Sequence, residues 1–524
     1  MSNFIKSHKW VIIATLIILL QTGASIAAII EVYILNMLPG KYFAMLIAAF
    51  IVLLGITVGI IIPKGKNKGF RYFRRSFGTV MSLVVATVGI VASVYIGHLN
   101  NTVSKVSTDA NSSNKIGVYV LKDNKADGID KITDKSFAVT STYDYENTVV
   151  ALENIKEETG KDILTTKYET VTDMVDALFR QDVEVVVLNE AYVSILEDLK
   201  QYKSFGKKTK IVYEYEVAEE VADVRQPVTN DGDISDDSMA KKPFILYISG
   251  SDTRESTLAT SRSDVNILAV VNPVSKMVLL INTPRDYYVL TSKAAFWQYD
   301  KLTHCGAYGI DCSMDTLGKL YEEEVDYYAQ INFDGFSAVI DALGGVTVEN
   351  DISFTSDDDY FYPKGVVTMD GAHALSFVRE RHSFADGDNQ RGKNQMKVIK
   401  ALIAKAKDST TLLTNYTDIL ASIEGMFLTN VSTQDMADLV RMQLNDMPDW
   451  NVISYSVSGT GASKETFTLP NKKTYVTVPD QASVDKAEEL IDRVYAGEIL
   501  TEEDTIIEDS TTSQGTASQS VTGD

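Results

Sequence analysis

The sequence is poor in basic residues and in histidine. Its 524 residues include 49 lysines and arginines against 71 aspartates and glutamates, which gives a net charge of −22, and only five histidines. A nucleic-acid partner requires a basic surface, so this balance argues against nucleic acid as a partner. His304 has no partner at the spacing of a metal site, and we therefore expect it to have a structural role.

The first hundred residues also lack the features of a cleaved signal peptide. No small-residue cleavage site leads from the first apolar run into a polar region, and a second apolar run follows almost at once. The windows 10–35, 42–62 and 77–99 each offer roughly 20 largely uncharged residues, the length that crosses about 30 Å of hydrocarbon. We therefore expect a bundle of three transmembrane helices within residues 1–100.

Charges in the two connections between these windows predict the orientation of the chain. The first connection carries only Glu31 and Lys41, whereas the second, residues 63–76, is basic. The positive-inside bias places residues 63–76 and the N-terminus in the cytoplasm, and everything after about residue 100 outside the cell membrane. The basic residues are Lys64, Lys66, Lys68, Arg71, Arg74 and Arg75.

Cysteine is nearly absent from the chain. The only two cysteines, Cys305 and Cys312, lie seven residues apart in the region assigned to the outer, oxidising side. A small disulfide loop and a pair of reduced, buried thiols both fit this pattern, and the sequence leaves the choice open.

Beyond the membrane windows, predicted strands alternate with predicted helices. Strand-like runs at 116–121 and 183–188 and helical stretches at 146–158 and 171–181 indicate a small α/β domain, in which we find no catalytic constellation. A larger α/β domain with a buried sheet follows an acidic linker, and the Ser/Thr-rich end of the chain has little to bury. The expected divisions are a membrane region over residues 1–100, an accessory domain with linkers over 101–240, a main domain over 241–500 and a disordered tail over 501–524.

Three strand-like runs, 244–248, 264–271 and 277–282, bring charged residues to one edge of the expected sheet. The turn between the second and third runs is short enough for an antiparallel hairpin, which would place Arg285 close to Asp264. If the first run is also antiparallel to the second, the loop between them leaves the same edge. That loop would add Asp252, Arg254 and Arg262 to the group.

This group of carboxylates and guanidiniums is typical of phosphate chemistry. Mg²⁺ takes one or two protein carboxylates together with phosphate oxygens, and arginine presents a planar fork that matches phosphate. Ordinary surface ion pairs use the same residue types, but a second charged set appears downstream. We expect Arg379 and Arg381 to lie on one face of a strand. Arg391 and Gln395 would share a helical face near a helix start, where anions are favoured.

Several separated blocks of this region resemble the LytR-CpsA-Psr family of Gram-positive cell-envelope proteins. The blocks are SDVNILAVVNPVSKMVLLINTPRD, KLTHCGAYG, INFDGFSAVIDALGGVTV and FVRERHSFADGDNQRGKNQ, and the resemblance spans roughly 245–405. Together with the membrane windows and the inserted outer domain, they resemble the capsule-associated branch. The resemblance implies an extracellular α/β/α domain with a central mixed sheet.

The resemblance also implies a reaction. A glycopolymer, for this branch capsular polysaccharide, would pass with its phosphate from undecaprenyl pyrophosphate to peptidoglycan, with release of undecaprenyl phosphate. The lipid bilayer and other capsule-assembly membrane proteins are further expected partners, and Mg²⁺ or Mn²⁺ on Asp252 and Asp264 is the implied cofactor. The implied pyrophosphate ligands are Arg254, Arg262, Arg285, Arg379, Arg381, Arg391 and Gln395, with Asp388 beside them in the catalytic group.

Two other functions would use the same residues. One is a polyprenyl-pyrophosphate-binding regulator of capsule synthesis, and the other is a lipid pyrophosphatase with water as the acceptor.

The general base stays unassigned between Asp264 and Asp388. An apolar stripe would line a groove for the polyprenyl tail or pack in the core. Its members are Phe333, Phe336, Val339, Ile340 and Leu343.

Overall fold

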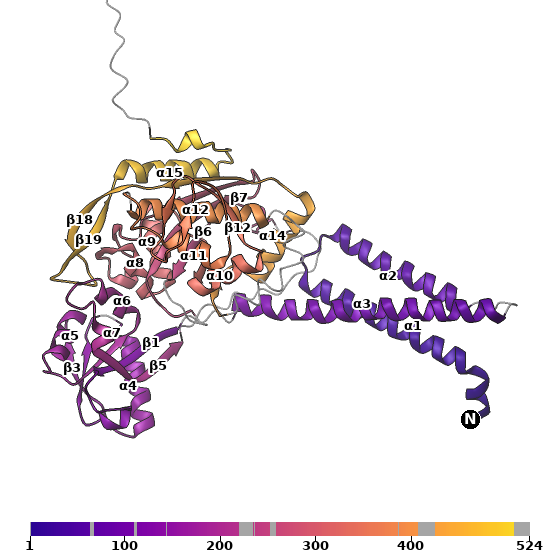
Figure 1. Cartoon of the computed structure of the whole chain (residues 1–524), viewed down its shortest axis with the longest axis horizontal. Helices are drawn as coiled ribbons and strands as arrows, with labels where there is room; N and C mark the ends of the chain where they lie inside the picture. The colour runs from indigo at the N-terminus through magenta and orange to yellow at the C-terminus, as the bar shows by residue number, and fades with distance from the viewer. Residues whose placement is uncertain are drawn as a thin grey trace, which may run out of the picture.

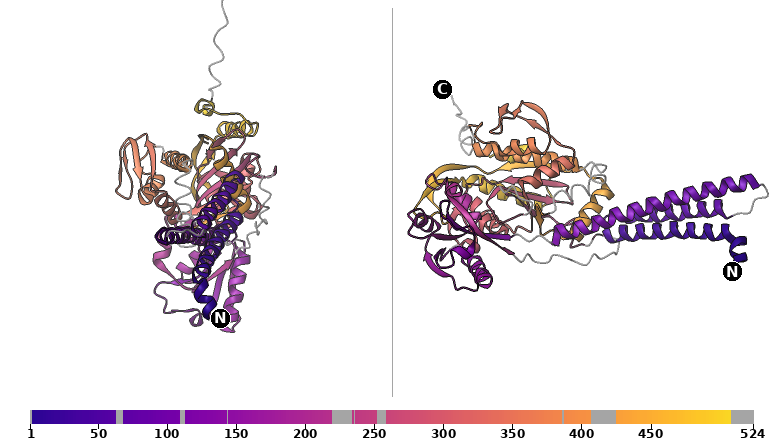
Figure 2. Two further views of the ribbon diagram at one scale, coloured as in Figure 1. Left: turned by 90° about the vertical axis from the view of Figure 1, so that its right-hand side faces the viewer. Right: turned by 60° about the horizontal axis from the view of Figure 1, so that its bottom comes forward.

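The computed structural model describes residues 2–62, 68–108, 113–142, 144–218, 234, 236–251, 258–385, 387–406 and 425–507. Three long helices extend from one end of the molecule, and two α/β bodies lie together at the other end (Figure 1). The turned views in Figure 2 show the same division.

The three long helices are α1 (Ser2–Leu35), α2 (Gly40–Ile61) and α3 (Lys68–Thr108). Each contains a stretch that is long and apolar enough to cross a membrane, as the apolar windows predicted. The basic connection is shorter than expected, because α3 begins at Lys68 and residues 68–76 are helical.

Close packing joins α1 to α3. A Cβ added to Gly89 would lie 3.0 Å from the carbonyl oxygen of Ala24, so the two helix backbones nearly touch. Ser82 Oγ donates a hydrogen bond to Gln21 Oε1 at 2.6 Å between the same helices. Small residues and interhelical hydrogen bonds are the usual means of helix association in hydrocarbon.

Residues 113–218 form a five-stranded sheet with the order β3-β2-β4-β1-β5. Neighbouring residues of β1 point to opposite faces, so that Val118 packs with α4 and Tyr119 packs with α5. The predicted runs and helical stretches of this region are all present. The elements are β1 (Ser113–Leu121), η1 (Ile129–Lys131), β2 (Ser136–Thr140), α4 (Tyr145–Thr159), β3 (Leu164–Tyr168), α5 (Val171–Phe179), β4 (Val185–Asn189), α6 (Ala191–Glu197), α7 (Phe205–Lys208) and β5 (Thr209–Ala218).

A six-stranded mixed sheet forms the centre of the larger body, in the order β16-β11-β6-β7-β8-β17. β7 is antiparallel to β8, as the short turn after residue 272 predicted, and it is also antiparallel to β6. In contrast, β11 and β17 join as parallel strands. The strands are β6 (Phe244–Ser251), β7 (Ser263–Asn272), β8 (Met277–Asn282), β11 (Tyr327–Asn332), β16 (Phe427–Thr429) and β17 (Asn451–Ser456).

Helices cover both faces of this sheet, which gives the predicted α/β/α layers (Figure 1). Leu279 and Ile281 of β8 pack with α9 and α15, whereas Val278 and Leu280 pack with Met396 of α12. Because both faces of β6, β7 and β8 are largely buried, these strands are near-continuous apolar runs in the sequence. The helices are α8 (Leu302–Cys305), α9 (Ile310–Leu320), α10 (Phe333–Ala342), α11 (Gly371–Arg379), α12 (Gly387–Ala406), α14 (Thr433–Asp446) and α15 (Gln481–Tyr495).

Short two-stranded sheets and 3-10 turns complete the larger body. The strand pairs are β9 (Tyr288–Leu290) with β10 (Tyr299–Lys301), β12 (Val346–Asn350) with β15 (Gly365–Met369), β13 (Phe354–Thr355) with β14 (Phe361–Tyr362), and β18 (Gly459–Glu465) with β19 (Lys473–Pro479). The 3-10 turns are η2 (Lys293–Ala295), η3 (Gly306–Tyr308) and η4 (Glu502–Thr505).

The strand predicted around Arg379 and Arg381 is wrong. Arg379 is the last residue of helix α11, and Arg381 follows the end of that helix. The side chain of Asp370 accepts a hydrogen bond from the backbone N–H of His373 and so caps the helix start. This cap favours a helix over the strand that the apolar run suggested.

The tail is also structured further than predicted. Thr501 and Asp504 form a capping box at the start of η4, and Arg493 Nη2 lies 2.8 Å from Asp504 Oδ1. Residues 501–507 are therefore ordered against α15. Residues 508–524 lie outside the described residues.

Candidate active site

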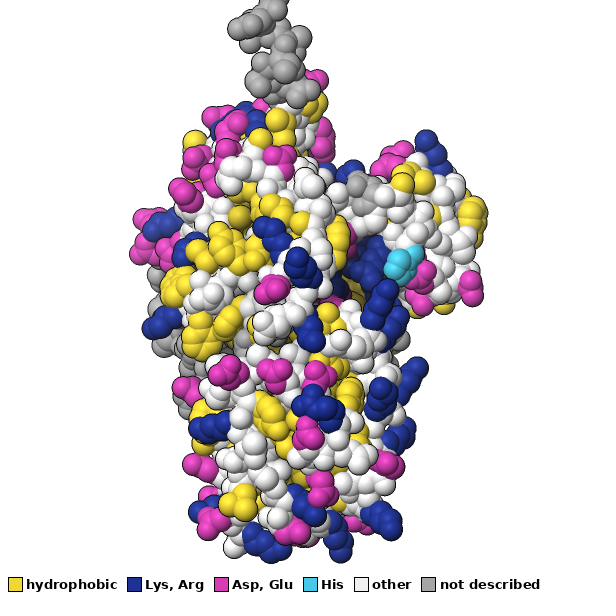
Figure 3. All heavy atoms as spheres, turned by 90° about the vertical axis from the view of Figure 1, so that its left-hand side faces the viewer, with side chains coloured by type: hydrophobic (Ala, Val, Ile, Leu, Met, Phe, Trp, Pro, Cys, Tyr) yellow, Lys and Arg dark blue, Asp and Glu magenta, His cyan; other side chains and the backbone are white. Residues whose placement is uncertain are grey.

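A pocket of about 520 Å³ lies against the face of the six-stranded sheet that α12 covers, between strands β6, β7 and β11 and helices α10, α11 and α12. The polarity of the pocket lining changes along α12, from the charged Arg391 through the polar Gln395 to the apolar Ile399 and Leu402. These residues share one helical face over about 16 Å, so one end of the pocket is charged and the other is apolar. Lys and Arg side chains gather beside a hollow in the face shown in Figure 3.

The structure brings most of the predicted phosphate ligands together at the charged end. The predicted site residues that line the pocket are Arg262, Asp264, Arg285, Arg379, Arg381, Arg391 and Gln395. They come from the start of β7, the segment after β8, the end of α11 and the first turns of α12. Asp252 and Arg254, which were also predicted, lie outside the described residues.

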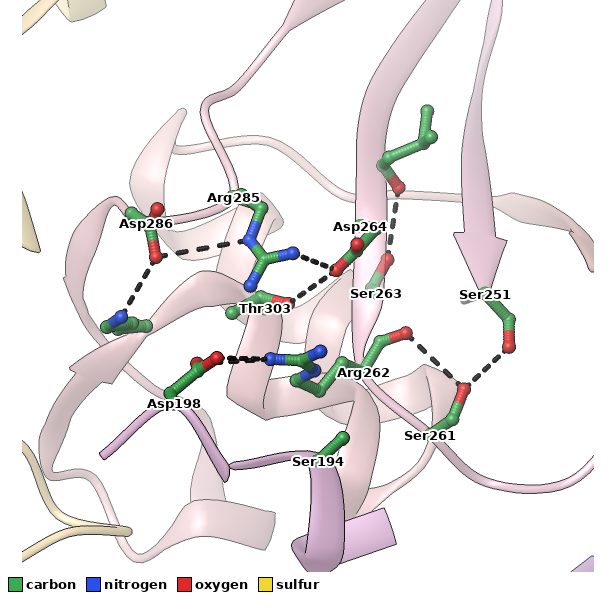
Figure 4. Close-up of polar contacts among 12 residues, drawn as sticks. Ser194, Asp198, Ser251, Ser261, Arg262, Ser263, Asp264, Arg285, Asp286 and Thr303 are labelled. Atoms are coloured by element: carbon green, nitrogen blue, oxygen red, sulfur yellow. Dashed lines mark hydrogen bonds and ion pairs between the residues drawn. The ribbon is translucent and has the colours of Figure 1, made fainter. Parts of the chain in front are cut away.

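Arg285 and Asp264 form a buried ion pair in this group (Figure 4). Arg285 Nη1 donates to Asp264 Oδ1 at 2.6 Å, and Thr303 Oγ1 donates to the same oxygen at 3.4 Å. Burial opposes ionisation of Asp264, but the nearby guanidiniums, Arg285 first, outweigh it and hold the pKa of Asp264 below its ordinary value. Asp264 is therefore a carboxylate in the site.

Asp286 and Lys301 support Arg285 from its other side. Arg285 Nε lies 4.0 Å from Asp286 Oδ1 (Figure 4). Lys301 Nζ lies 3.0 Å from the same oxygen. Burial opposes the charge of Asp286, but Lys301 and Arg285 hold its pKa below the ordinary value. Sequence reasoning missed this pair, and the one signal for it was the position of Asp286 next to Arg285.

Arg391 lies in the first turns of α12 and is paired with Asp388, three residues earlier. Arg391 Nη2 lies 2.6 Å from Asp388 Oδ1, and burial lowers the pKa of Arg391 and raises that of Asp388. Asp388 itself is not among the described residues that line the pocket, so its contact with the site is the ion pair with Arg391. Gly392 allows this placement, because a Cβ there would lie 2.2 Å from the side-chain nitrogen of Asn282.

Arg379 and Arg381 face the pocket although they do not lie on a strand. The guanidinium of Arg379 lies 4.7 Å above the centre of the Phe333 ring. Glu380 between them is buried, and its oxygens accept hydrogen bonds from the backbone N–H groups of Asp357 and Ser383 at 2.7 and 2.8 Å. Both arginines therefore reach the pocket from the end of a helix and not from the predicted strand.

A second acidic group lies at the rim of the pocket. Carboxylate oxygens of Asp357 and Glu380 and a ring nitrogen of His382 lie within 4.8 Å of one another, which is close enough for a metal ion. Glu380 already accepts hydrogen bonds from backbone N–H groups, and His382 Nδ1 lies 2.6 Å from Asp357 Oδ2. We therefore assign these residues a structural role, in which they fix the backbone at the pocket rim. Sequence reasoning missed this group.

The predicted apolar stripe divides between the pocket and the core. Phe333, Phe336 and Val339 of α10 line the pocket, whereas Ile340 and Leu343 are buried. Val339 and Phe427 of the pocket wall also pack against a small cluster formed by Ala437 and Met37, and Met37 lies just after α1. The apolar end of the pocket therefore adjoins the membrane helices. The stripe members and partners on this wall are Phe333, Phe336, Val339, Ile399, Leu402 and Phe427.

His304 and the two cysteines lie in the core beside this site. His304 Nδ1 lies 2.6 Å from Asp300 Oδ1, and both side chains are fully buried. Asp300 Oδ2 also accepts a hydrogen bond from the backbone N–H of Thr468 at 2.7 Å, as expected for a structural network. Cys305 and Cys312 are buried free thiols, so the structure has the reduced pair rather than the disulfide.

The sequence and this geometry agree with one known protein family. The model of the LytR_cpsA_psr family matches residues 208–490, more than half of the chain. The chain belongs to the LytR_cpsA_psr family. The described arginines of the pocket, Arg262, Arg285, Arg379, Arg381 and Arg391, all lie within the region that matches.

Relatives within the LytR_cpsA_psr family include proteins named polyisoprenyl-teichoic acid-peptidoglycan teichoic acid transferase TagU. The one from Bacillus cereus (strain AH820) is 30% identical over 287 residues, which cover 53% of this chain and 90% of that protein. The one from Enterococcus faecalis (strain ATCC 700802 / V583) is 34% identical over 198 residues, covering 37% of this chain and 64% of that protein.

Solved structures of similar proteins cover about half of this chain. The crystal structure of B. subtilis TagV is 23% identical with a TM-score of 0.41, and covers 49% of this chain and 98% of that chain. The structure of TagT bound to LIIa-WTA is 26% identical with a TM-score of 0.38, and covers 49% of this chain and 92% of that chain.

The described residues of the LytR_cpsA_psr site fit a divalent cation in part. Asp264 offers a carboxylate on the pocket wall, beside guanidiniums that suit phosphate oxygens. Mg²⁺ needs one or two protein carboxylates when phosphate oxygens supply further ligands. Asp264 meets this need alone or with Asp252, which lies outside the described residues.

Proposed function

We propose that this protein transfers a lipid-linked glycopolymer, with its phosphate, to peptidoglycan and releases undecaprenyl phosphate. The observation that carries the proposal is one pocket with arginines at one end and an apolar wall at the other. A pyrophosphate group fits the first end and a polyprenyl chain fits the second. The names of the TagU relatives describe the transfer of teichoic acid to peptidoglycan, which supports the same reaction class.

The side chains of the pocket act mainly through position and charge. The acceptor hydroxyl attacks the sugar-linked phosphorus, and the bond from that phosphorus to the bridging oxygen breaks. The arginines hold the pyrophosphate and offset the charge that develops on the leaving undecaprenyl phosphate. Asp264 is engaged by Arg285 and is therefore a weak base, so we leave proton removal without an assigned residue.

A divalent cation, Mg²⁺ or Mn²⁺, is part of this proposal. Asp264 would hold it together with Asp252, and Arg285 would keep the Asp264 carboxylate in place. When bound, the cation supplies positive charge to the pyrophosphate oxygens. Support comes from the low pKa of Asp264, because a hard cation requires an ionised carboxylate.

We further propose that the α/β bodies lie outside the cell membrane. The basic segment 63–76 favours the cytoplasm, and this places the N-terminus inside and residues after 108 outside. Undecaprenyl carriers lie in the bilayer that the three helices would cross. Capsular polysaccharide is the polymer that the resemblance to the capsule-associated branch favours, with capsule-assembly membrane proteins as further partners.

A transfer assay with the purified full chain in detergent tests the proposal. A labelled undecaprenyl-pyrophosphate saccharide and peptidoglycan fragments are incubated with the wild type, Arg391→Ala, or the control Arg180→Ala. Arg180 is distant from Arg391 in the sequence and forms an exposed ion pair with Asp182. We expect product with the wild type and the control, and loss of product with Arg391→Ala.

The other outcomes identify the alternatives. Lipid binding without any broken phosphate bond would establish a carrier-binding regulator in place of an enzyme. Release of undecaprenyl phosphate with water alone would establish a pyrophosphatase.

A further inference from the structure

The segment that carries Arg262 is held by the five-stranded unit, residues 113–218, which we call the accessory unit. Arg262 lines the pocket, and its Nη1 donates to both carboxylate oxygens of Asp198 at 3.1 and 3.0 Å (Figure 4). Asp198 follows helix α6 of the accessory unit, 64 residues earlier in the chain. The two side chains are 11% and 29% exposed, so this pair is partly shielded from water.

The backbone before Arg262 is fixed by the same unit. Thr260 N donates to Ser113 O at 3.0 Å, and Ser113 forms a parallel bridge with Ala259. Ser113 is the first residue of β1, the strand that follows membrane helix α3. The accessory unit therefore contacts both the side chain of Arg262 and the chain that leads to it.

A third contact runs through η3. A Cβ added to Gly306 would lie 2.5 Å from Ser261 O and 2.7 Å from Ser263 N, so Gly306 lies directly against the backbone on both sides of Arg262. The next residues, Ala307 and Tyr308, pack into the core of the accessory unit. The Tyr308 ring lies edge-on to that of Tyr192 at 6.1 Å between centres.

We propose that the accessory unit is part of the pyrophosphate site, with Asp198 as the positioning residue for Arg262. This inference rests on the proposed function. An arginine side chain has many rotamers, and a ligand that must order it loses affinity. Asp198 orders Arg262 before the ligand arrives, and the contacts at Ser113 and Gly306 fix the backbone from which Arg262 extends.

The sign of the effect separates positioning from charge. A carboxylate near a pyrophosphate repels it, so a purely electrostatic role predicts tighter binding when Asp198 is removed. Positioning predicts weaker binding. The structure favours positioning because both oxygens of Asp198 are turned to the guanidinium of Arg262.

Binding of geranylgeranyl pyrophosphate to the full chain in detergent tests the inference. We expect Asp198→Ala to weaken binding about 10-fold, at the lower end of losses seen when the partner that orients a ligating side chain is removed. Asp198→Glu should restore most of the affinity. Asp182→Ala is the matched control, because Asp182 pairs with Arg180 on the exposed surface of the same unit.

A double-mutant comparison keeps the test specific. Asp198→Ala should have no further effect on affinity in an Arg262→Ala background, whereas general damage to the fold would lower affinity in both backgrounds. Unchanged or tighter binding by Asp198→Ala overturns the inference while the wild type still binds and transfers. Failure of the wild type to bind the probe overturns the proposed function, and the inference with it.

Discussion

Arg285 and Asp264 are joined across the β7-β8 hairpin by a hydrogen bond of 2.6 Å from Nη1 to Oδ1. Their side chains are only 8% and 16% exposed. The pair holds a carboxylate and a guanidinium on the pocket wall at fixed positions. Removing either partner would leave the other as a buried, uncompensated charge.

Arg285→Ala should therefore reduce both stability and transfer. We expect the free energy of unfolding to fall by about 3–5 kcal/mol, the cost of breaking a buried pair. Transfer should fall roughly 10²- to 10³-fold, the usual cost of removing one group that stabilises developing charge. Urea denaturation and the transfer assay measure these effects. Arg180→Ala, which breaks an exposed pair, should change neither, and an Arg285→Ala protein with wild-type transfer would refute the role of Arg285.

Gly306→Ala should disturb the site through the backbone alone. Gly306 has φ −59°, which alanine adopts without strain, but the new Cβ would collide with Ser261 O and Ser263 N. We expect a loss of about 1–3 kcal/mol in the free energy of unfolding and weaker binding of polyprenyl pyrophosphate. Gly128→Ala is the control, because no atom lies within 4 Å of its added Cβ. Equal melting temperature and affinity for Gly306→Ala and the wild type would show that the neighbouring backbone shifts to accommodate the added methyl group at no cost.

Local patterns predicted much of the fold and some of the site. The short turn after residue 272 predicted the hairpin, and antiparallel pairing then placed Arg285 beside Asp264. Helical spacing placed Arg391 and Gln395 on one face of α12. In each case the geometry follows from residues that are close in sequence or joined by one turn.

Contacts between distant elements could not be predicted in this way. Asp198 meets Arg262 only because the accessory unit packs against the larger body, and no periodicity in either segment signals this. The apolar run before Arg379 fits a strand or a helix, and the cap at Asp370 decides the outcome. Sequence patterns define elements, whereas the packing of elements defines the remaining site contacts.

Asp300→Asn should destabilise the core and remove an acid-sensitive contribution to stability. Burial opposes the charge of Asp300, but His304 and the Thr468 hydrogen bonds outweigh it and hold its pKa below the ordinary value of 3.8. The folded state therefore stabilises the ionised form of Asp300. The contribution of Asp300 to the free energy of unfolding is complete above pH 3.8 and is lost as the pH falls below that value.

Unfolding measured in urea from pH 3 to pH 7 checks this. The free energy of unfolding of the wild type should exceed that of Asp300→Asn by about 3–5 kcal/mol near pH 7, and the difference should be smaller toward pH 3. A difference that does not vary with pH would show that Asp300 is not ionised in the folded protein.

Phe336→Asp should lower the affinity of the pocket for a long polyprenyl tail. Phe336 lines the apolar wall of the pocket, so a carboxylate there removes about 1.5–3 kcal/mol of apolar contact, or roughly 10- to 100-fold in affinity. The loss should be larger for undecaprenyl pyrophosphate than for geranyl pyrophosphate, whose short chain reaches less of the wall. Val366→Asp, at a site that is 75% exposed on β15, is the control. Equal losses for both chain lengths would place the tail elsewhere.

Chelation of divalent cations should stop transfer without unfolding the protein. Asp264 is held as a carboxylate by the arginines, and a cation shared with pyrophosphate oxygens would add charge that the guanidiniums alone do not place at this point. We expect EDTA to abolish product while the protein stays folded, and excess Mg²⁺ or Mn²⁺ to restore product. Calorimetric titration of Mg²⁺ gives a readout apart from activity. Binding should be stronger when geranylgeranyl pyrophosphate is present, and Asp264→Asn should weaken it. Full transfer in EDTA would instead mean that the arginines suffice for the reaction.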